Sequence, residues 1–201
     1  KLPASNLIIT SNPEIDDDKL PATKFYVSKL NSRFESNGVA GHLSPQLLLN
    51  NHEAILIDFL NTKIHHGEYA ALLKNSQATE INDLTGHVCR AQGPEKAPLF
   101  VLIVNIDNIP MRLLLDSNAE DTTVIQGHPA ALKLSKEGKS NFSKLHKGKV
   151  TVGGKTVTRM VDIQPLTNLP CGVEGVLGMD ILKLCAFVTD GKRMGINCQN
   201  D

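Results

Sequence analysis

The pattern of apolar and polar positions changes about half-way along this chain of 201 residues. Residues 1–90 show mainly the spacing of amphipathic helices, whereas residues 99–201 show the short apolar runs and the alternation of β-strands. Residues 91–98 lie between them and contain two prolines, one glycine and few apolar side chains, which is typical of a linker. We therefore expect a small α-helical N-terminal region, a linker and an all-β C-terminal domain, giving an α+β chain.

Three helices are predicted in the N-terminal region, after an irregular stretch over residues 1–21. The first has apolar residues on one face, at Phe25, Val27, Leu30 and Phe34. The second would begin at Ser44, because serine caps helices and the following proline fits a first turn. Its apolar residues are Leu47, Leu48, Ile55, Ile57 and Leu60. The third is expected over Gly67–Lys74.

Strands and tight turns alternate in the C-terminal domain. The apolar run Leu99–Val104 is followed by a turn at Asp107-Asn108 and a return strand that ends at Asp116. Gly153-Gly154 separates two alternating runs, which is a strong signal for a two-residue hairpin turn. A last strand pair is predicted around Asp190-Gly191, and one short helix is predicted over Asp180–Leu184.

Composition narrows the possible functions. The formal net charge is +0, and there is no Trp and only 4% aromatic residues, so a basic or base-stacking surface for nucleic acid is not expected. The longest apolar runs are too short to span a bilayer, so membrane insertion is not expected either. The four cysteines include no CxxC pair, which argues against a zinc site. They would suit two disulfides in an oxidising, extracytoplasmic compartment, or buried free thiols.

The stretch from Leu114 to Ile125 carries the most chemical information, with the sequence LLDSNAEDTTVI. Apolar residues lead into Asp116, and a Thr-Val pair follows after a short gap. Downstream come a Val-Gly-Gly hairpin turn and the run Gly175–Leu182, GVLGMDIL, in which apolar residues and a glycine lead into a helix. In order and spacing, these stretches resemble the retropepsin-like (clan AA) aspartic proteases, in the bacterial form that carries a single motif.

The resemblance implies an acid-protease barrel with one short helix over residues 99–201, and an aspartic endopeptidase activity. In this class, two carboxylates share one proton and activate a water molecule for attack on the scissile carbonyl. Because the chain supplies one motif, the resemblance implies a homodimer in which Asp116 of each copy meets on a two-fold axis. It implies a peptide or protein substrate and neither a metal nor an organic cofactor. The residues expected to support the dyad and the motif are Ser117, Asn118, Ala119, Thr123, Val176, Leu177 and Gly178.

Asn118 departs from the family's pattern, which has glycine at this position. Asparagine tolerates left-handed backbone better than most residues, so the turn can still form and its backbone N–H can still reach the aspartate. Its side chain, however, adds bulk beside the dyad. Two interpretations therefore stay open, an active peptidase and an inactive protease-like module that binds peptides or dimerises.

The family's mobile flap corresponds here to residues 136–142, with Gly138 as its tip and Lys139 and Phe142 near substrate. Residues 133–149 carry six lysines and one acidic residue, which suits an acidic substrate or partner, or a simple solvated loop. Asp180 is expected to open the short helix and is not read as catalytic. His65 and His66 are neighbours on a predicted helix and would not face one metal, so we expect them to face solvent.

Overall fold

The computed structural model describes residues 54–81, 88–90, 98–134, 144–166 and 169–199, together with the short segments 8–11, 14–15, 18–19, 23–26 and residue 49. The chain divides into two compact units, residues 1–52 and 53–201. The sequence pattern had placed a division at residues 91–98, of which only residue 98 lies in the described part.

Short antiparallel strand pairs make up the described part of the first unit. β1 (Ile8–Ser11) pairs with β4 (Thr23–Tyr26), and β2 (Glu14–Ile15) pairs with β3 (Asp18–Lys19). Phe25, which was expected on a helix, therefore lies in a strand. The other members of that predicted helix, and Ser44, Leu47 and Leu48 of the second, lie outside the described residues.

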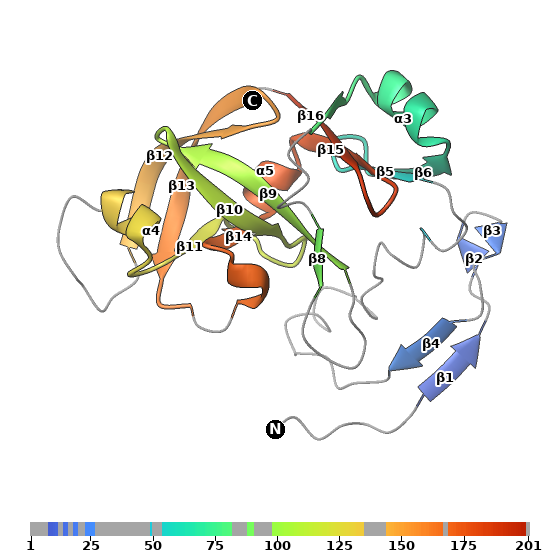
Figure 1. Ribbon diagram of the computed structural model, residues 1–201, viewed down its shortest axis with the longest axis horizontal. Helices are drawn as coiled ribbons and strands as arrows, with labels where there is room; N and C mark the ends of the chain where they lie inside the picture. The colour runs from blue at the N-terminus through green and yellow to red at the C-terminus, as the bar shows by residue number, and fades with distance from the viewer. Residues whose placement is uncertain are drawn as a thin grey trace. The chain divides into compact units, whose positions relative to one another are not determined.

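A sheet that closes on itself forms the body of the second unit (Figure 1). Its strands are β9 (Pro98–Ile106), β10 (Ile109–Leu115), β11 (Thr123–Ile125), β12 (Lys144–Val152), β13 (Lys155–Gln164) and β14 (Gly175–Leu177). The strand order is β10-β14-β11-β13-β12-β9, and β9 also pairs with β10, which completes a barrel. β8 (Val88–Arg90) pairs with the first residues of β9. The described part of the C-terminal region is thus mostly β, as predicted.

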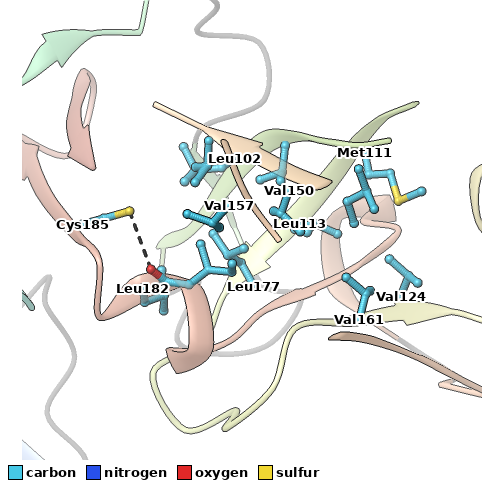
Figure 2. Close-up of a cluster of buried hydrophobic side chains, with 14 of the residues drawn as sticks. Leu102, Met111, Leu113, Val124, Val150, Val157, Val161, Leu177, Leu182 and Cys185 are labelled. Carbon is cyan, nitrogen blue, oxygen red and sulfur yellow. Dashed lines mark hydrogen bonds between the residues drawn. The ribbon is translucent and has the colours of Figure 1, made fainter. Parts of the chain in front are cut away.

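The barrel encloses a core of branched aliphatic side chains, because alternate residues of each strand point inward. On β9, for example, Leu102, Val104 and Ile106 are buried, whereas Ile103 between them is exposed. Figure 2 shows how side chains from several strands meet in this core. Its labelled members are Leu102, Met111, Leu113, Val124, Val150, Val157, Val161, Leu177, Leu182 and Cys185.

A second, antiparallel sheet has the strand order β6-β5-β15-β16-β7. Its strands are β5 (Ala54–Asp58), β6 (Lys63–Gly67), β7 (Thr79–Glu80), β15 (Cys185–Thr189) and β16 (Met194–Cys198). Every residue of β15 is buried. Phe187 faces the barrel core, whereas Ala186 and Val188 pack against Tyr69 and Leu72 of α3 (Tyr69–Ser76). This sheet therefore has the barrel on one face and α3 on the other.

The helical interpretation of residues 55–60 was wrong. Ile55 and Ile57 lie in β5, which pairs with β15, a strand more than a hundred residues further along the chain. The two isoleucines and Leu56 between them are a short apolar run that is ambiguous by itself, and the distant partner decides its state. The third predicted helix, Gly67–Lys74, corresponds to α3, which begins and ends two residues later.

The other helices of the second unit are short. They are α4 (Pro129–Leu134), the 3₁₀ turn η1 (Pro170–Gly172) and α5 (Met179–Leu182). Among the described residues, no helix is long and apolar enough to cross a membrane. Cys185 and Cys198 form a disulfide between the start of β15 and the end of β16, and Cys171 is disulfide-bonded as well. Of the two alternatives for the cysteines, these three residues follow the disulfide one.

Candidate active site at the Asp116 loop

The strand order of the barrel places Asp116 where the chain leaves β10 and crosses the end of β14 to reach β11. β14 lies between β10 and β11, running parallel to β10 and antiparallel to β11. The loop of residues 116–122 therefore joins two strands that are not neighbours and passes over the end of β14. Asp116 is the first residue after β10, and the buried side chains of Met111 and Leu113 hold that strand in the core, which fixes the position of the Asp116 backbone.

Hydrogen bonds hold the Asp116 turn in place. The N–H of Asp116 donates to the carbonyl oxygen of Leu177 at 3.2 Å, and the N–H of Ala119 donates to the carbonyl of Asp116 at 3.1 Å. The N–H of Asn118 donates to Asp116 Oδ1 at 2.8 Å. This last bond fixes the orientation of the carboxylate. Asp116 itself is half-buried, whereas Ser117 and Asn118 are exposed.

Asn118 does not need the conformational freedom of glycine in this chain. Among the described residues with positive φ, the non-glycine ones are Thr62, Gln77, Asp107, Asn108 and Cys171. Asn118 is absent from that group, so its backbone has an ordinary negative φ. The turn forms with asparagine at this position, and it does so without a left-handed backbone, so what remains is the exposed side chain beside Asp116.

The far half of the loop is fastened to the start of α5. The N–H of Met179 donates to the carbonyl of Ala119 at 2.8 Å, and the N–H of Asp180 donates to the carbonyl of Glu120 at 3.0 Å. The hydroxyl of Thr122, which is fully buried, donates to Asp180 Oδ1 at 2.7 Å and accepts the N–H of Gly178 at 3.2 Å. The loop is thus tied at both ends, to β14 and to α5.

Thr122 and the side chain of Asp180 were missed as supports of the loop. The sequence pattern gave Asp180 only the role of opening the helix, and it does lie in the first turn of α5. The signal that was available is the Thr-Thr pair at the end of the motif. In a strand that follows the loop, one of two adjacent threonines must point inward, where its hydroxyl needs a buried partner.

Two glycines allow the strand and helix to approach the loop closely. A Cβ at Gly178 would lie 2.5 Å from the carbonyl carbon of Asp121 and 2.9 Å from the nitrogen of Thr122. A Cβ at Gly175 would lie 2.1 Å from the carbonyl oxygen of Thr123. These contacts are with backbone atoms, so no side chain can turn away to make room. The glycine of the downstream motif therefore has a steric role.

The remaining predicted residues fall into two groups. Thr123 pairs with Asp162 of β13 and with Val176 of β14, and Leu177 pairs with Leu115 at the end of β10. The motif residues of β10, β11 and β14 are therefore next to one another. The flap residues Gly138, Lys139 and Phe142 lie outside the described residues, and their role stays a prediction.

Within the described segments of the chain, no group of three or more His, Cys, Asp or Glu side chains is placed to hold a metal ion. His65 and His66 lie on β6 rather than on a helix, and both are exposed. The solvent exposure predicted for these two histidines agrees with the structure, whereas the helix predicted for them does not.

Comparisons with known proteins find similar solved structures, but no matching family model and no matching curated protein. A retropepsin-like aspartic protease from Rickettsia conorii is similar with 20% sequence identity and a TM-score of 0.39, over 59% of this chain and 88% of that one. The EIAV protease, solved with the inhibitor HBY-793, is similar with 18% identity and a TM-score of 0.32, over 41% of this chain and 84% of that one. The first of these proteins is described as a retropepsin-like aspartic protease, the class that the Asp116 motif resembles, and the second as a protease.

Proposed function

We propose that this chain is an aspartic endopeptidase that acts as a homodimer. The observation that carries the proposal is the Asp116 turn, in which a half-buried carboxylate is oriented by the Asn118 N–H at 2.8 Å. The turn is anchored to β14 and α5 by backbone hydrogen bonds, while its tip at Ser117 and Asn118 stays exposed. A half-buried carboxylate held in a fixed orientation next to an exposed tip is the arrangement that a shared dyad requires.

In the proposed mechanism, Asp116 of one protomer and Asp116 of its partner lie together and share one proton, because two adjacent negative charges repel strongly. The ionised carboxylate takes a proton from a water molecule as it attacks the peptide carbonyl. The protonated one gives its proton to the carbonyl oxygen, which forms a tetrahedral diol. The carboxyl group that took the proton of the water then passes it to the leaving nitrogen, and the other carboxylate regains a proton from the diol as the new carbonyl forms. Ser117 would donate across the two-fold axis and steady the opposite loop. A single chain carries half of this machinery.

The second candidate is a protease-like module without catalysis, which binds peptides or dimerises. The exposed side chain of Asn118 beside Asp116 is the observation that favours it. In a dimer, two such side chains would lie close to the dyad and take up space that a substrate or the opposite loop needs. The two candidates share the fold and differ in whether water and peptide reach the carboxylates.

A peptide-library digest separates these candidates. The wild type, Asp116→Asn, Asn118→Gly and the control Glu120→Gln are incubated with the library at acidic and at neutral pH, and the products are identified by mass spectrometry. The control removes an exposed carboxylate from the same loop. Cleavage by the wild type and the control, but not by Asp116→Asn, supports the peptidase. Equal behaviour of wild type and Asp116→Asn rejects it, and cleavage gained by Asn118→Gly alone supports the inactive module.

A further inference from the structure

A half-buried carboxyl group is hydrogen-bonded to the Asp116 loop. Asp180, on the first turn of α5, has one oxygen, Oδ1, that accepts the Thr122 hydroxyl at 2.7 Å. Its other oxygen, Oδ2, is buried and has no hydrogen-bond partner among the residues that the structure describes. An unpartnered ionised oxygen is far more costly to bury than an unpartnered neutral one. The packed arrangement therefore favours the protonated form of this side chain.

The groups around Asp180 act in both directions, and their net effect disfavours a negative charge on its side chain. Asp121, in the loop, adds a second negative charge nearby. On β13, the Arg159 Nε donates to the backbone carbonyl of Asp180 at 3.4 Å, and the Asp162 carboxylate accepts the side-chain amide of Gln164. Burial above all, helped by Asp121, raises the pKa of Asp180, against the opposing effect of the Thr122 hydroxyl and nearby backbone N–H groups.

Backbone hydrogen bonds connect Asp180 to the candidate catalytic turn. The N–H of Asp180 donates to the carbonyl of Glu120, and the neighbouring N–H of Met179 donates to the carbonyl of Ala119. Ala119 in turn donates its N–H to the carbonyl of Asp116. Any movement of α5 that hydrates the Asp180 carboxylate would displace the carbonyl groups of Ala119 and Glu120. Ala119 is the last residue of the turn that orients Asp116.

We propose that Asp180 is a positioning residue whose neutral carboxyl group holds the Asp116 loop against α5, and whose ionisation releases the loop. The folded state binds this proton more tightly than the unfolded chain does. Stability of the loop contact is therefore greatest below the ordinary carboxyl range and declines as pH rises through the raised pKa of Asp180. A consequence for catalysis follows only if the proposed peptidase function holds, whereas the pH dependence of the loop contact does not depend on that function.

Amide hydrogen exchange measured by NMR tests this contact. The measurement uses the full chain carrying Asp116→Asn, so that the candidate catalytic carboxyl group cannot titrate and activity plays no part. The reporters are the amides of Met179 and Asp180, which bond to the loop at 2.8 and 3.0 Å. Their protection, corrected for the intrinsic pH dependence of exchange, should fall as pH rises, with a limiting slope of about tenfold per pH unit for one linked proton.

Two further variants in the same background identify the responsible group. Adding Asp180→Asn should remove the pH dependence, because the amide side chain has nearly the same shape and does not titrate. Adding Asp121→Asn should keep the fall in protection and move it to lower pH, since one negative neighbour is gone. Protection that is flat with pH in the parent, or that falls equally with Asp180→Asn, would overturn the proposal.

If the Asp180→Asn protein does not fold, the carboxyl carbon of Asp180 is titrated directly in the Asp116→Asn parent. Protection at Met179 must then fall at pH values up to the midpoint measured for Asp180 and level off above it, and a fall that ends well below that midpoint or continues well above it would equally overturn the proposal. Loss of peptidase activity in the wild type leaves both results unaffected. A failure of the proposed function and a failure of this inference are therefore distinguishable.

Discussion

Replacing Gly178 with alanine tests whether the loop that carries Asp116 depends on the close approach of α5. An added Cβ would lie 2.5 Å from the carbonyl carbon of Asp121 and 2.6 Å from its oxygen. Neither atom can move without displacing the loop, which is tied to α5 by two backbone hydrogen bonds. Gly178 has φ −92° and ψ 179°, an extended conformation that alanine adopts without strain, so the effect of the substitution is purely steric.

The expected cost follows from two opposing contributions. Overpacking a close-packed site costs about 1–3 kcal/mol, and contacts with backbone on a fastened loop favour the upper end of this range. Alanine also restricts the unfolded chain, which stabilises the fold by about 0.4–1 kcal/mol. The net loss is therefore about 2 kcal/mol, which lowers the melting temperature by roughly 4–8 °C for a unit of this size.

Gly195→Ala is the matched control. A Cβ there would approach Leu73 Cδ2 to 2.2 Å, but its next contacts lie at 3.5 Å. The Leu73 methyl is the end of a flexible, half-buried side chain that can turn away. We expect this variant to lose less than about 1 kcal/mol in urea unfolding, at the low end of overpacking costs. Equal losses in the two variants, or a loss below about 0.5 kcal/mol for Gly178→Ala, would refute the reasoning.

Three smaller predictions concern the rest of the second unit. Tyr69→Phe should leave the free energy of unfolding unchanged or raise it by up to about 1 kcal/mol in thermal melts, because the buried hydroxyl has no hydrogen-bond partner among the described residues. A loss of stability above about 1 kcal/mol would mean that the hydroxyl is hydrogen-bonded. Leu72→Ala should cost about 2–5 kcal/mol in urea titration by opening a cavity between α3 and the sheet, and a loss below about 1 kcal/mol would contradict that packing. The Lys149 N–H, followed by His146, holds the pKa of Asp107 below its ordinary value, so this carboxylate contributes stability at neutral pH that is lost as pH falls through its folded pKa. Asp107→Asn should therefore flatten the acid limb of a stability–pH curve, and an unchanged limb would exclude this contribution.

Local signals in the sequence predicted the turns of the barrel well. Asp107-Asn108 and Gly153-Gly154 were identified as turns from residue type, and all four residues have the positive φ that such tight turns use. The strands that flank these turns, β9 with β10 and β12 with β13, pair antiparallel as expected. These features depend on residues that are close together in the chain, which is why a single sequence suffices.

Pairings over long distances in the chain could not be predicted in this way. β5 becomes a strand because β15 is beside it, and the sequence around Ile55 does not reveal that partner. The insertion of β14 between β10 and β11 likewise follows from the closed sheet as a whole. The hydrogen bond between Thr122 and Asp180 joins residues 58 positions apart, so the support behind Asp116 emerges only in three dimensions.

The position of Asp116 was predicted from the motif, and the structure adds how it is held. The sequence suggested that the turn can form with Asn118 through a tolerated left-handed backbone, whereas the backbone adopts an ordinary φ and its N–H orients the carboxylate. In the proposed dimer, the difference between an active and an inactive protein would lie in the space that the Asn118 side chain occupies between the two copies.

The most direct test of a shared active site is a subunit-mixing measurement. Wild type and Asp116→Asn are mixed at constant total concentration, allowed to exchange subunits, and assayed with a peptide that the wild type cleaves. If each active site needs Asp116 from both protomers, an equal mixture should retain about one quarter of the wild-type rate, because only that share of dimers carries two aspartates. Retention of about one half would mean that each chain acts alone, and would contradict the proposed dyad.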